Sequence, residues 1–248
     1  MNRVSYLCVT GLLSILLSAC GTPHGQPSEG SEPVAPDQIL EFATLYAQNC
    51  SGCHGANGKG GPAIALGDPV YLALVDDAAI RKAIASGVNG TSMPAFAQSA
   101  GGMLTDKQID VISGEIRARW SKPGVLIGTD PLSYAAKSTG DVQRGEAVFK
   151  IYCESCHGQS GHGGQKASAI TNDSFLALVN DQVLRTIVIA GRPELGAPDW
   201  RGNVPGKPMS DQEVTDVVAW LASQRAQNPG RPYSALSYSQ HQEPDHAK

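Results

Sequence analysis

The chain has 248 residues, of which 41% are hydrophobic and 17% charged, and its formal net charge is −4. An acidic balance argues against nucleic acid as a partner, because binding to phosphates requires a positively charged surface. It suits a partner protein that presents a basic docking patch.

The N-terminus predicts export from the cytoplasm. Arg3 precedes an apolar run over residues 4–17 that is too short to span a membrane, and small residues follow it. Residues 17–20, Leu-Ser-Ala-Cys, resemble a bacterial lipobox. The resemblance implies that residues 1–19 are a signal peptide and that Cys20 is lipidated. The mature protein would then be a membrane-anchored lipoprotein facing the periplasm or the cell exterior, and an uncleaved membrane anchor is the alternative.

Two polar segments flank the expected folded part. Residues 20–36 are rich in Gly, Pro, Ser and Glu and predict a flexible tether, because such a stretch cannot bury a core. Residues 227–248 are similarly polar and predict a disordered tail. That tail holds His241 and His246, for which a metal role is one interpretation and simple solvation the other.

The first chemical motif follows a predicted helix. Residues 39–48 are expected to be helical, and the helix leads into Cys50-Ser-Gly-Cys53-His54. C-x-x-C-H is the attachment signature of c-type haem: the two thiols meet the two vinyl groups of one porphyrin, and the adjacent imidazole can bind the iron. A zinc knuckle would need two closely spaced cysteine pairs, and a thioredoxin-like dithiol would need a βαβ setting. The sequence provides neither.

A second motif of the same kind, Cys153-Glu-Ser-Cys156-His157, follows a helix predicted over 142–152. The chain is therefore expected to carry two covalent haem c groups. Their predicted thioether and iron-binding residues are Cys50, Cys53 and His54 in the first motif and Cys153, Cys156 and His157 in the second.

The two halves are copies of each other. Residues 71–77, Tyr-Leu-Ala-Leu-Val-Asp-Asp, match residues 175–181, Phe-Leu-Ala-Leu-Val-Asn-Asp. Further matched pairs are Arg81 and Arg185, Gly87 and Gly191, Pro94 and Pro198, and Phe96 and Trp200. The duplication predicts two domains, residues 37–121 and 141–226, joined by a linker over 122–140.

Each copy is expected to be helical. A Gly-rich loop follows the haem motif (58–61 and 161–164), and the last of the middle helices (76–86 and 182–190) ends at a glycine. A final helix then begins with a capping box, Thr105 with Gln108 or Ser210 with Glu213. Its apolar residues recur at helical spacing: Ile109, Ile112, Ile116 and Trp120, then Val214, Val217, Val218 and Leu221. No alternating strand pattern is present, so the predicted fold class is all-α.

Each half resembles a class I cytochrome c domain, and the whole resembles the periplasmic diheme cytochromes c. The resemblance rests on a helix ending in C-x-x-C-H, a Met-Pro loop and a capped terminal helix, and it covers residues 37–121 and 141–226. It implies an all-α fold with two tandem domains, each wrapped around one haem. Aromatic residues are only 6% of the chain, and a porphyrin can fill the core volume that they leave.

Met93 is the predicted sixth ligand of the first iron. Ser92-Met93-Pro94 lies in the loop before the final helix, where the family places its axial methionine. A thioether is a soft ligand that favours Fe(II), so it raises the reduction potential. Met103 competes for this role, but it directly precedes the final helix and is expected to be a packing residue.

The second copy departs from this pattern. Ala197 stands at the position of Met93, and alanine cannot ligate iron. Met209 is the predicted sixth ligand, because the Pro- and Gly-containing loop before it could fold back over the porphyrin. Two alternatives stay open: Met209 aligns with Leu104 and only packs the core, or the second iron is five-coordinate.

Other side chains give weaker signals. His162 or Lys207 could also reach the second iron, although His162 is expected to be an ordinary loop residue. Arg81 and Arg185 could pair with haem propionates, but an exposed helix face is the expected setting for both. The aromatic residues expected to line a haem pocket or to pack between helices are Tyr46, Tyr71, Phe96, Phe175 and Trp200.

Two functional hypotheses follow. The first is a membrane-tethered diheme carrier that passes single electrons between redox partners, either a membrane oxidoreductase or a soluble carrier; such a protein need not be an enzyme. The second is a diheme oxidoreductase in which an open C-terminal iron binds peroxide, nitric oxide or a sulfur compound. A fixed subunit of a respiratory or photosynthetic complex is a third arrangement. The sequence leaves the oligomeric state open.

Overall fold

A computed structural model describes residues 33–226 of the chain. The expected signal peptide, the lipidation of Cys20, most of the tether and the polar tail lie outside the described residues. The chain divides after Gln38. The 3-10 turn η2 (Pro36–Gln38) belongs to the N-terminal unit, and the described residues 39–226 belong to one compact unit.

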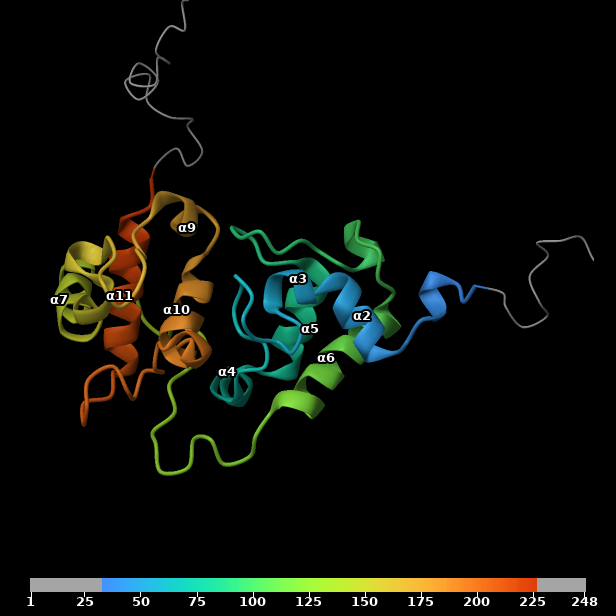
Figure 1. Cartoon of the computed structure of the whole chain (residues 1–248), viewed down its shortest axis with the longest axis horizontal. Helices are drawn as coiled ribbons and strands as arrows, with labels where there is room; N and C mark the ends of the chain where they lie inside the picture. Colours follow the sequence, from blue (N-terminus) through green and yellow to red (C-terminus); the bar gives the residue numbers. More distant parts are fainter. Residues whose placement is uncertain (1–32, 227–248) are drawn as a thin grey trace, which may run out of the picture. The chain divides into compact units, whose positions relative to one another are not determined.

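The compact unit is built from helices (Figure 1). Residues 39–120, which we call the N-terminal lobe, contain α2 (Phe42–Asn49), α3 (Ser51–His54), α4 (Pro69–Leu74), α5 (Asp77–Ser86), η3 (Gln98–Ala100) and α6 (Asp106–Trp120). Residues 141–226, the C-terminal lobe, contain α7 (Val142–Tyr152), α8 (Glu154–His157), η4 (Gln159–Gly161), α9 (Asp173–Ala177), α10 (Asp181–Ala190), η5 (Pro193–Leu195) and α11 (Asp211–Ser223). Residues 33–226 contain no strand, only two isolated bridges, so the predicted all-α class is confirmed. None of the helices in this range has the length and apolar character needed to cross a bilayer.

The predicted capping boxes begin both final helices. The hydroxyls of Thr105 and Ser210 accept a hydrogen bond from the N–H of the third helical residue, whose side chain accepts one from the cap in return. The helices α5 and α10 end, as predicted, at glycines: Gly87 and Gly191 both have a φ of +69°. Local sequence therefore sets these helix boundaries.

Helix α2 begins later than the sequence predicts. The expected start was residue 39, but the carboxylate of Glu41 accepts hydrogen bonds from the N–H groups of Ala43 and Thr44. This cap fixes the first helical residue at Phe42. Ile39 instead lies before the helix, where its carbonyl accepts a hydrogen bond from the side chain of Gln108.

Each lobe has its own hydrophobic core. In the N-terminal lobe, Ile109, Ile112 and Ile116 of α6 are fully buried, as their helical spacing predicts. In the C-terminal lobe, α11 packs along α7, and the ring centroids of Phe149 and Trp220 lie 4.4 Å apart. Each buried side chain of this size contributes about 1.5–3 kcal/mol relative to an exposed one.

The two cores interlock through α4 and α10. Tyr71 and Leu72 of α4 lie in the N-terminal core, whereas Val70 and Leu74 of the same helix pack into the C-terminal core. Ala190 of α10 crosses in the other direction and joins the N-terminal core. The lobes therefore share apolar side chains in addition to the chain that joins them.

The segment over residues 122–140 packs along the C-terminal lobe. Val125, Leu126 and Leu132 pack against the core of that lobe. Tyr134 packs against the N-terminal core instead, with its ring centroid 6.3 Å from that of Tyr71. The segment thus contacts the cores of both lobes.

Arg185 does not lie on an exposed helix face, so that expectation was wrong. Only 1% of the residue is exposed. The guanidinium donates hydrogen bonds to the carbonyl of Ser133 and the hydroxyl of Thr215, and it pairs with the carboxylate of Asp211. The linker covers it, which the pattern of α10 alone could not reveal. Its counterpart Arg81 has a side chain that is 41% exposed, as expected.

Candidate functional site

The first Cys-x-x-Cys-His sequence forms a single helical turn directly after α2. Cys50 ends α2, with its N–H donating to the carbonyl of Tyr46 at 2.9 Å. The N–H groups of Cys53 and His54 both donate to the carbonyl of Cys50, at 3.2 and 3.0 Å. A helical turn therefore holds both thiols and the imidazole close together along the chain.

The imidazole of His54 is prepared to act as a neutral ligand. Its Nδ1 lies 2.9 Å from the carbonyl oxygen of Ile64, and because a carbonyl can only accept, Nδ1 carries the proton. The lone pair of Nε2 is then available for a metal. Burial lowers the pKa of His54, and the positive charge of Arg192 adds to this effect. The residues present therefore fit an iron-bound haem.

The second motif repeats this geometry in α8. The N–H groups of Cys156 and His157 donate to the carbonyl of Cys153 at 3.1 and 2.9 Å. Nδ1 of His157 lies 2.9 Å from the carbonyl oxygen of Ser168, so its Nε2 is also available. The sequence did not predict the carbonyls of Ile64 and Ser168, because a main-chain acceptor carries no signature in residue type.

The surroundings of Cys50 and Cys153 do not favour redox exchange at these two thiols. Burial raises the pKa of Cys50 to about 11 and that of Cys153 to about 12, so both are protonated at neutral pH and are poor nucleophiles. Within residues 33–226, no three His, Cys, Asp or Glu side chains converge as metal ligands.

The Gly-rich loops that follow both motifs lie close against the main chain of each motif. A Cβ atom on Gly61 would lie 2.1 Å from the carbonyl oxygen of Cys53, and one on Gly164 would lie 2.9 Å from that of Cys156. Both approaches are too close for any residue but glycine. In the first loop, the N–H of Ala63 also donates to the carbonyl of Cys53 at 3.0 Å. The glycines let each loop reach the histidine that it orients.

Comparison with known sequences agrees with this geometry. The family described as cytochrome C oxidase, cbb3-type, subunit III, matches residues 37–113 and 140–221, one segment around each motif. The chain belongs to this family of c-type cytochromes. Membership implies covalent haem c and a role in electron transfer.

Curated relatives are subunits of larger assemblies. The cytochrome is 28% identical over 194 residues to the cytochrome bc1 complex cytochrome c subunit of Mycobacterium tuberculosis, a match that covers 75% of this chain and 64% of that protein. It is 30% identical over 145 residues to the cbb3-type cytochrome c oxidase subunit CcoP of Azospirillum sp. (strain B510), covering 52% of this chain and 44% of that protein. The cytochrome thus spans less than two thirds of the length of either relative.

Among solved structures, the thiosulfate dehydrogenase (TsdBA) of Marichromatium purpuratum aligns with 87% of this chain and 52% of its own. The sequence identity is 19% and the TM-score 0.31. A similarity at this level carries no conclusion about function.

Met93 lies in a loop that hydrogen bonds to Thr91 and Val88 stabilise. Its N–H donates to the Thr91 hydroxyl at 3.1 Å, and its carbonyl accepts from the N–H of Val88 at 3.1 Å. The half-buried side chain packs against the N-terminal core of the cytochrome. Met103, in contrast, is 82% exposed, so the expectation that it packs was wrong. Its neighbour Leu104 is buried instead and forms a parallel bridge with Ala97.

The structure places Ala197 where the first copy has Met93. A Cβ on Gly87 would lie 2.8 Å from the carbonyl oxygen of Met93, and one on Gly191 would lie 2.7 Å from that of Ala197. The two glycines therefore contact equivalent positions of the two loops. This agreement supports the sequence alignment of the two copies.

Met209 occupies the position of Leu104. Its N–H donates to the carbonyl of Trp200 at 2.9 Å, as the N–H of Leu104 does to Phe96 at 2.8 Å. The side chain is 2% exposed and lies in the C-terminal core, with its sulfur 3.9 Å from the amide nitrogen of Asn203. Ligation of the second iron by Met209 remains a prediction.

The two weaker candidates have other contacts. Nδ1 of His162 lies 3.3 Å from the carbonyl of Gln159 in its own loop, and the residue is exposed. The amino group of Lys207 lies 5.2 Å from the ring centroid of Tyr152, a distance typical of a cation–π contact.

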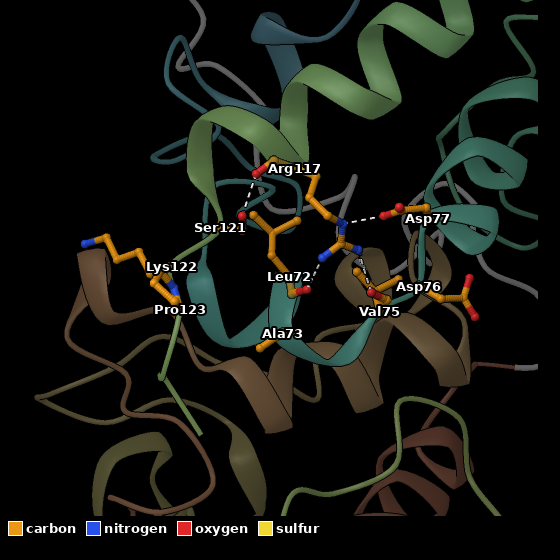
Figure 2. A pocket seen from close by; sticks show the side chains of 9 residues that line it. All are labelled: Leu72, Ala73, Val75, Asp76, Asp77, Arg117, Ser121, Lys122 and Pro123. Carbon is orange, nitrogen blue, oxygen red and sulfur yellow. Dashed lines mark hydrogen bonds and ion pairs between the residues drawn. The ribbon is translucent and has the colours of Figure 1, made fainter. Parts of the chain in front are cut away.

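A surface pocket lies apart from both motifs. Figure 2 shows that Arg117 of α6 points into it toward Asp77 and the end of α4. None of the residues that line it belongs to either Cys-x-x-Cys-His turn. The pocket is therefore not part of either candidate haem site.

Proposed function

We propose that the protein is a diheme c-type cytochrome that carries single electrons between redox partners outside the cytoplasm. The observation that carries this proposal is the repeated arrangement of two cysteines and a histidine whose Nδ1 meets a carbonyl oxygen at 2.9 Å in both copies. Haem c, once bound, supplies an iron that changes by one electron between Fe(III) and Fe(II). The function needs no substrate site in addition.

The protein's own residues would attach, orient and shield the cofactor. Cys50 and Cys53 in one lobe, and Cys153 and Cys156 in the other, would form the thioethers. The carbonyls of Ile64 and Ser168 fix which nitrogen of each imidazole carries the proton. Met93 would supply a thioether in the first lobe, which raises the potential of that site.

The two sites can be separated by variants. In Cys50→Ala/Cys53→Ala and in Cys153→Ala/Cys156→Ala, we expect each protein to retain half of the haem absorbance of the wild type. A redox titration of the wild type should require two electron equivalents per chain. If either double variant keeps all of the haem, attachment at that site is wrong.

A second candidate function concerns the C-terminal site alone. Ala197 provides no ligand at the position of Met93, and Met209 lies in the core. An iron without a sixth protein ligand could bind a small molecule such as peroxide, nitric oxide or a sulfur compound. Carbon monoxide added to the reduced protein distinguishes the functions: binding at half of the haem favours this candidate, and no binding removes it.

We further propose that the protein is tethered to a membrane by a lipid on Cys20 and works beside a respiratory complex. The lipobox-like residues 17–20 motivate the tether, and the relatives named as bc1 and cbb3 oxidase subunits motivate the setting. A tether raises the local concentration of a carrier near its partners. Cys20→Ser should release the cytochrome from the membrane fraction, and retention there would contradict the tether.

A further inference from the structure

Arg192 reaches from the C-terminal lobe into the N-terminal lobe. It follows Gly191 at the position that Val88 holds in the first copy. Its guanidinium donates to the carbonyl oxygen of Gly61 at 2.8 Å and pairs with Glu194 at 2.6 Å. Only 12% of the Arg192 side chain is exposed. Two charge-assisted partners at a mostly buried site hold the guanidinium in place.

Gly61 belongs to the loop that supports the first iron-binding histidine. Two residues later, the N–H of Ala63 donates to the carbonyl of Cys53 at 3.0 Å. The next residue, Ile64, provides the carbonyl that meets Nδ1 of His54 at 2.9 Å. Arg192 therefore holds the chain three residues before the group that orients the imidazole.

The packing around this bond is tight. Ile64 lines a small cavity of about 10 Å³ together with Ile187 and Ala190 of α10 and with Arg192. A second polar contact also joins the lobes: the amide of Asn180 donates to the carbonyl of Asn89 at 2.7 Å. The lobes thus meet through a close contact that contains both apolar and polar side chains.

The loop that carries Arg192 is the one that lacks the axial methionine. Arg192 and Ala197 exchange two backbone hydrogen bonds, of 2.9 and 3.0 Å, which close a turn around η5. The matching loop in the first copy carries Met93. In the C-terminal lobe, this loop contacts the other lobe.

We propose that Arg192 is a positioning residue that docks the C-terminal lobe onto the loop behind His54 and so sets the path for electron exchange between the two haem sites of one chain. The step transfers one electron: the donating site is oxidised by one electron, the receiving site is reduced by one, and no proton or co-reactant takes part. This inference rests on the proposed function, because it requires haem at both sites.

The experiment measures exchange between the two haems after rapid reduction of one of them. In the wild type, we expect a rate that is independent of protein concentration, since both sites belong to one chain. Arg192→Met removes the charge and both polar bonds but keeps the bulk. A small displacement of one site relative to the other slows a step that depends on their geometry, so we expect the rate of electron exchange to fall by about tenfold. Arg192→Lys should recover part of the loss.

The control is Lys150→Met, which removes a positive charge from an exposed pair with Glu146 in the same lobe. Its exchange rate should equal that of the wild type. A second readout is the potential of each haem. Loss of the positive charge near His54 should lower the potential of the N-terminal haem, which a purely structural role would not do.

The outcomes separate this inference from the proposed function. If the wild type carries no haem, the proposed function itself fails. If Arg192→Met carries both haems and exchanges electrons at the wild-type rate, only the role of Arg192 is overturned. If that variant does not fold, Glu194→Gln decides the matter: it keeps the bond to Gly61 but loosens the guanidinium, and a rate equal to the wild type would overturn the proposal.

Discussion

Gly61 is the residue whose replacement should damage the first site most directly. A Cβ atom at this position would lie 2.1 Å from the carbonyl oxygen of Cys53, and the other nearest atoms are also backbone, which cannot move aside as a side chain could. We expect Gly61→Ala to lose haem from the N-terminal lobe while the C-terminal lobe keeps its own. The haem absorbance per chain would fall by half.

Gly114 provides the control for this variant. It lies inside α6, and an added Cβ would meet no atom within 4 Å. Gly114→Ala should retain all of the haem and stabilise the helix by about 0.5–1 kcal/mol, because alanine is the better helix former. Full haem content in Gly61→Ala would show that the loop does not close on Cys53 as the structure has it.

The role of Met209 can be tested without damaging the core. Met209→Leu removes the sulfur but conserves volume, so it should cost less than about 1.5 kcal/mol of stability. If Met209 ligates the second iron, this variant should lower the potential of that haem and open it to carbon monoxide. An unchanged potential and spectrum would show that the side chain only packs.

Met93→Leu and Met103→Leu complete the set of ligand variants. Met93→Leu should lower the potential of the N-terminal haem, because a thioether favours Fe(II). Met103→Leu should change neither haem, because the side chain is 82% exposed. If only Met103→Leu changed the potential of the N-terminal haem, Met103 would be its ligand and Met93 would not.

At this scale, the sequence predicts the cysteines and histidines of the motifs but not the main-chain carbonyls that orient the histidines. The Cys-x-x-Cys-His motifs are explicit in residue type and spacing, and the structure repeats their helical turn in both copies. The carbonyls of Ile64 and Ser168 have no such signal, because any residue supplies one. Met103 was expected to pack because it directly precedes the final helix, yet it is its neighbour Leu104 that is buried, in a parallel bridge with Ala97.

At the scale of elements, an arginine braces the end of α4 in the N-terminal lobe. Arg117 donates to the carbonyls of Leu72 and Val75 and pairs with Asp77 at the start of α5 (Figure 2). These carbonyls end α4 and would otherwise lack partners within the helix. The brace therefore ties α4, α5 and α6 together.

The C-terminal lobe has a similar brace, from an arginine that lies just after the end of α11. Arg225 donates to the carbonyls of Leu176 and Val179 at 3.3 and 2.9 Å and pairs with Asp181 at 2.6 Å. These three residues match Leu72, Val75 and Asp77, but the residue that matches Arg117 is Ala222. The sequence repeat alone therefore could not reveal the second brace, since the arginine lies three residues later.

Removal of either brace should lower stability. We expect Arg117→Ala and Arg225→Ala each to reduce the free energy of unfolding by about 1–3 kcal/mol, because several carbonyls lose a charged donor. The matched control is Arg119→Ala, whose pair with Glu115 is exposed; it should cost less than about 1 kcal/mol. Urea unfolding followed by circular dichroism measures all three, and equal losses would contradict the brace.

Helix boundaries were the most predictable part of the fold. Capping boxes and terminal glycines fixed the ends of α5, α6, α10 and α11, because these signals act within a few residues. Helix α2 was predicted too long, since Glu41 was not recognised as its cap. Local signals of this kind say nothing about which side chains enter which core.

At the scale of the whole molecule, the segment between the repeats is held by the buried charge of Arg185. Its guanidinium is anchored to Asp211 and to the carbonyl of Ser133. We expect Asp211→Asn to reduce the free energy of unfolding by about 2–4 kcal/mol, because it leaves a buried charge without its counter-ion.

The equivalent pair in the N-terminal lobe provides an internal control. Asp106 opposite Arg81 has a side chain that is 79% exposed, so Asp106→Asn should cost less than about 1 kcal/mol. Thermal unfolding of both variants makes the comparison. Similar losses would mean that the linker does not bury Arg185.

The contact between the lobes could not be predicted from the repeat. The alignment of the copies shows that Arg192 replaces Val88, but it does not show that the arginine meets a carbonyl of the other lobe. Likewise, Val70 and Tyr71 are neighbours on α4 that pack into different cores. Which side chain enters which core depends on how the two similar lobes pack against each other. That packing is determined by many residues over both surfaces and not by a local sequence signal.

The most direct test is the intact mass of the mature protein, combined with the haem content measured after denaturation in pyridine. The account predicts the mass of the polypeptide plus two haem groups, which remain attached when the protein is unfolded. The variant Cys153→Ala/Cys156→Ala should carry one. A mature chain with no covalent haem at either Cys-x-x-Cys-His motif would contradict the central claim.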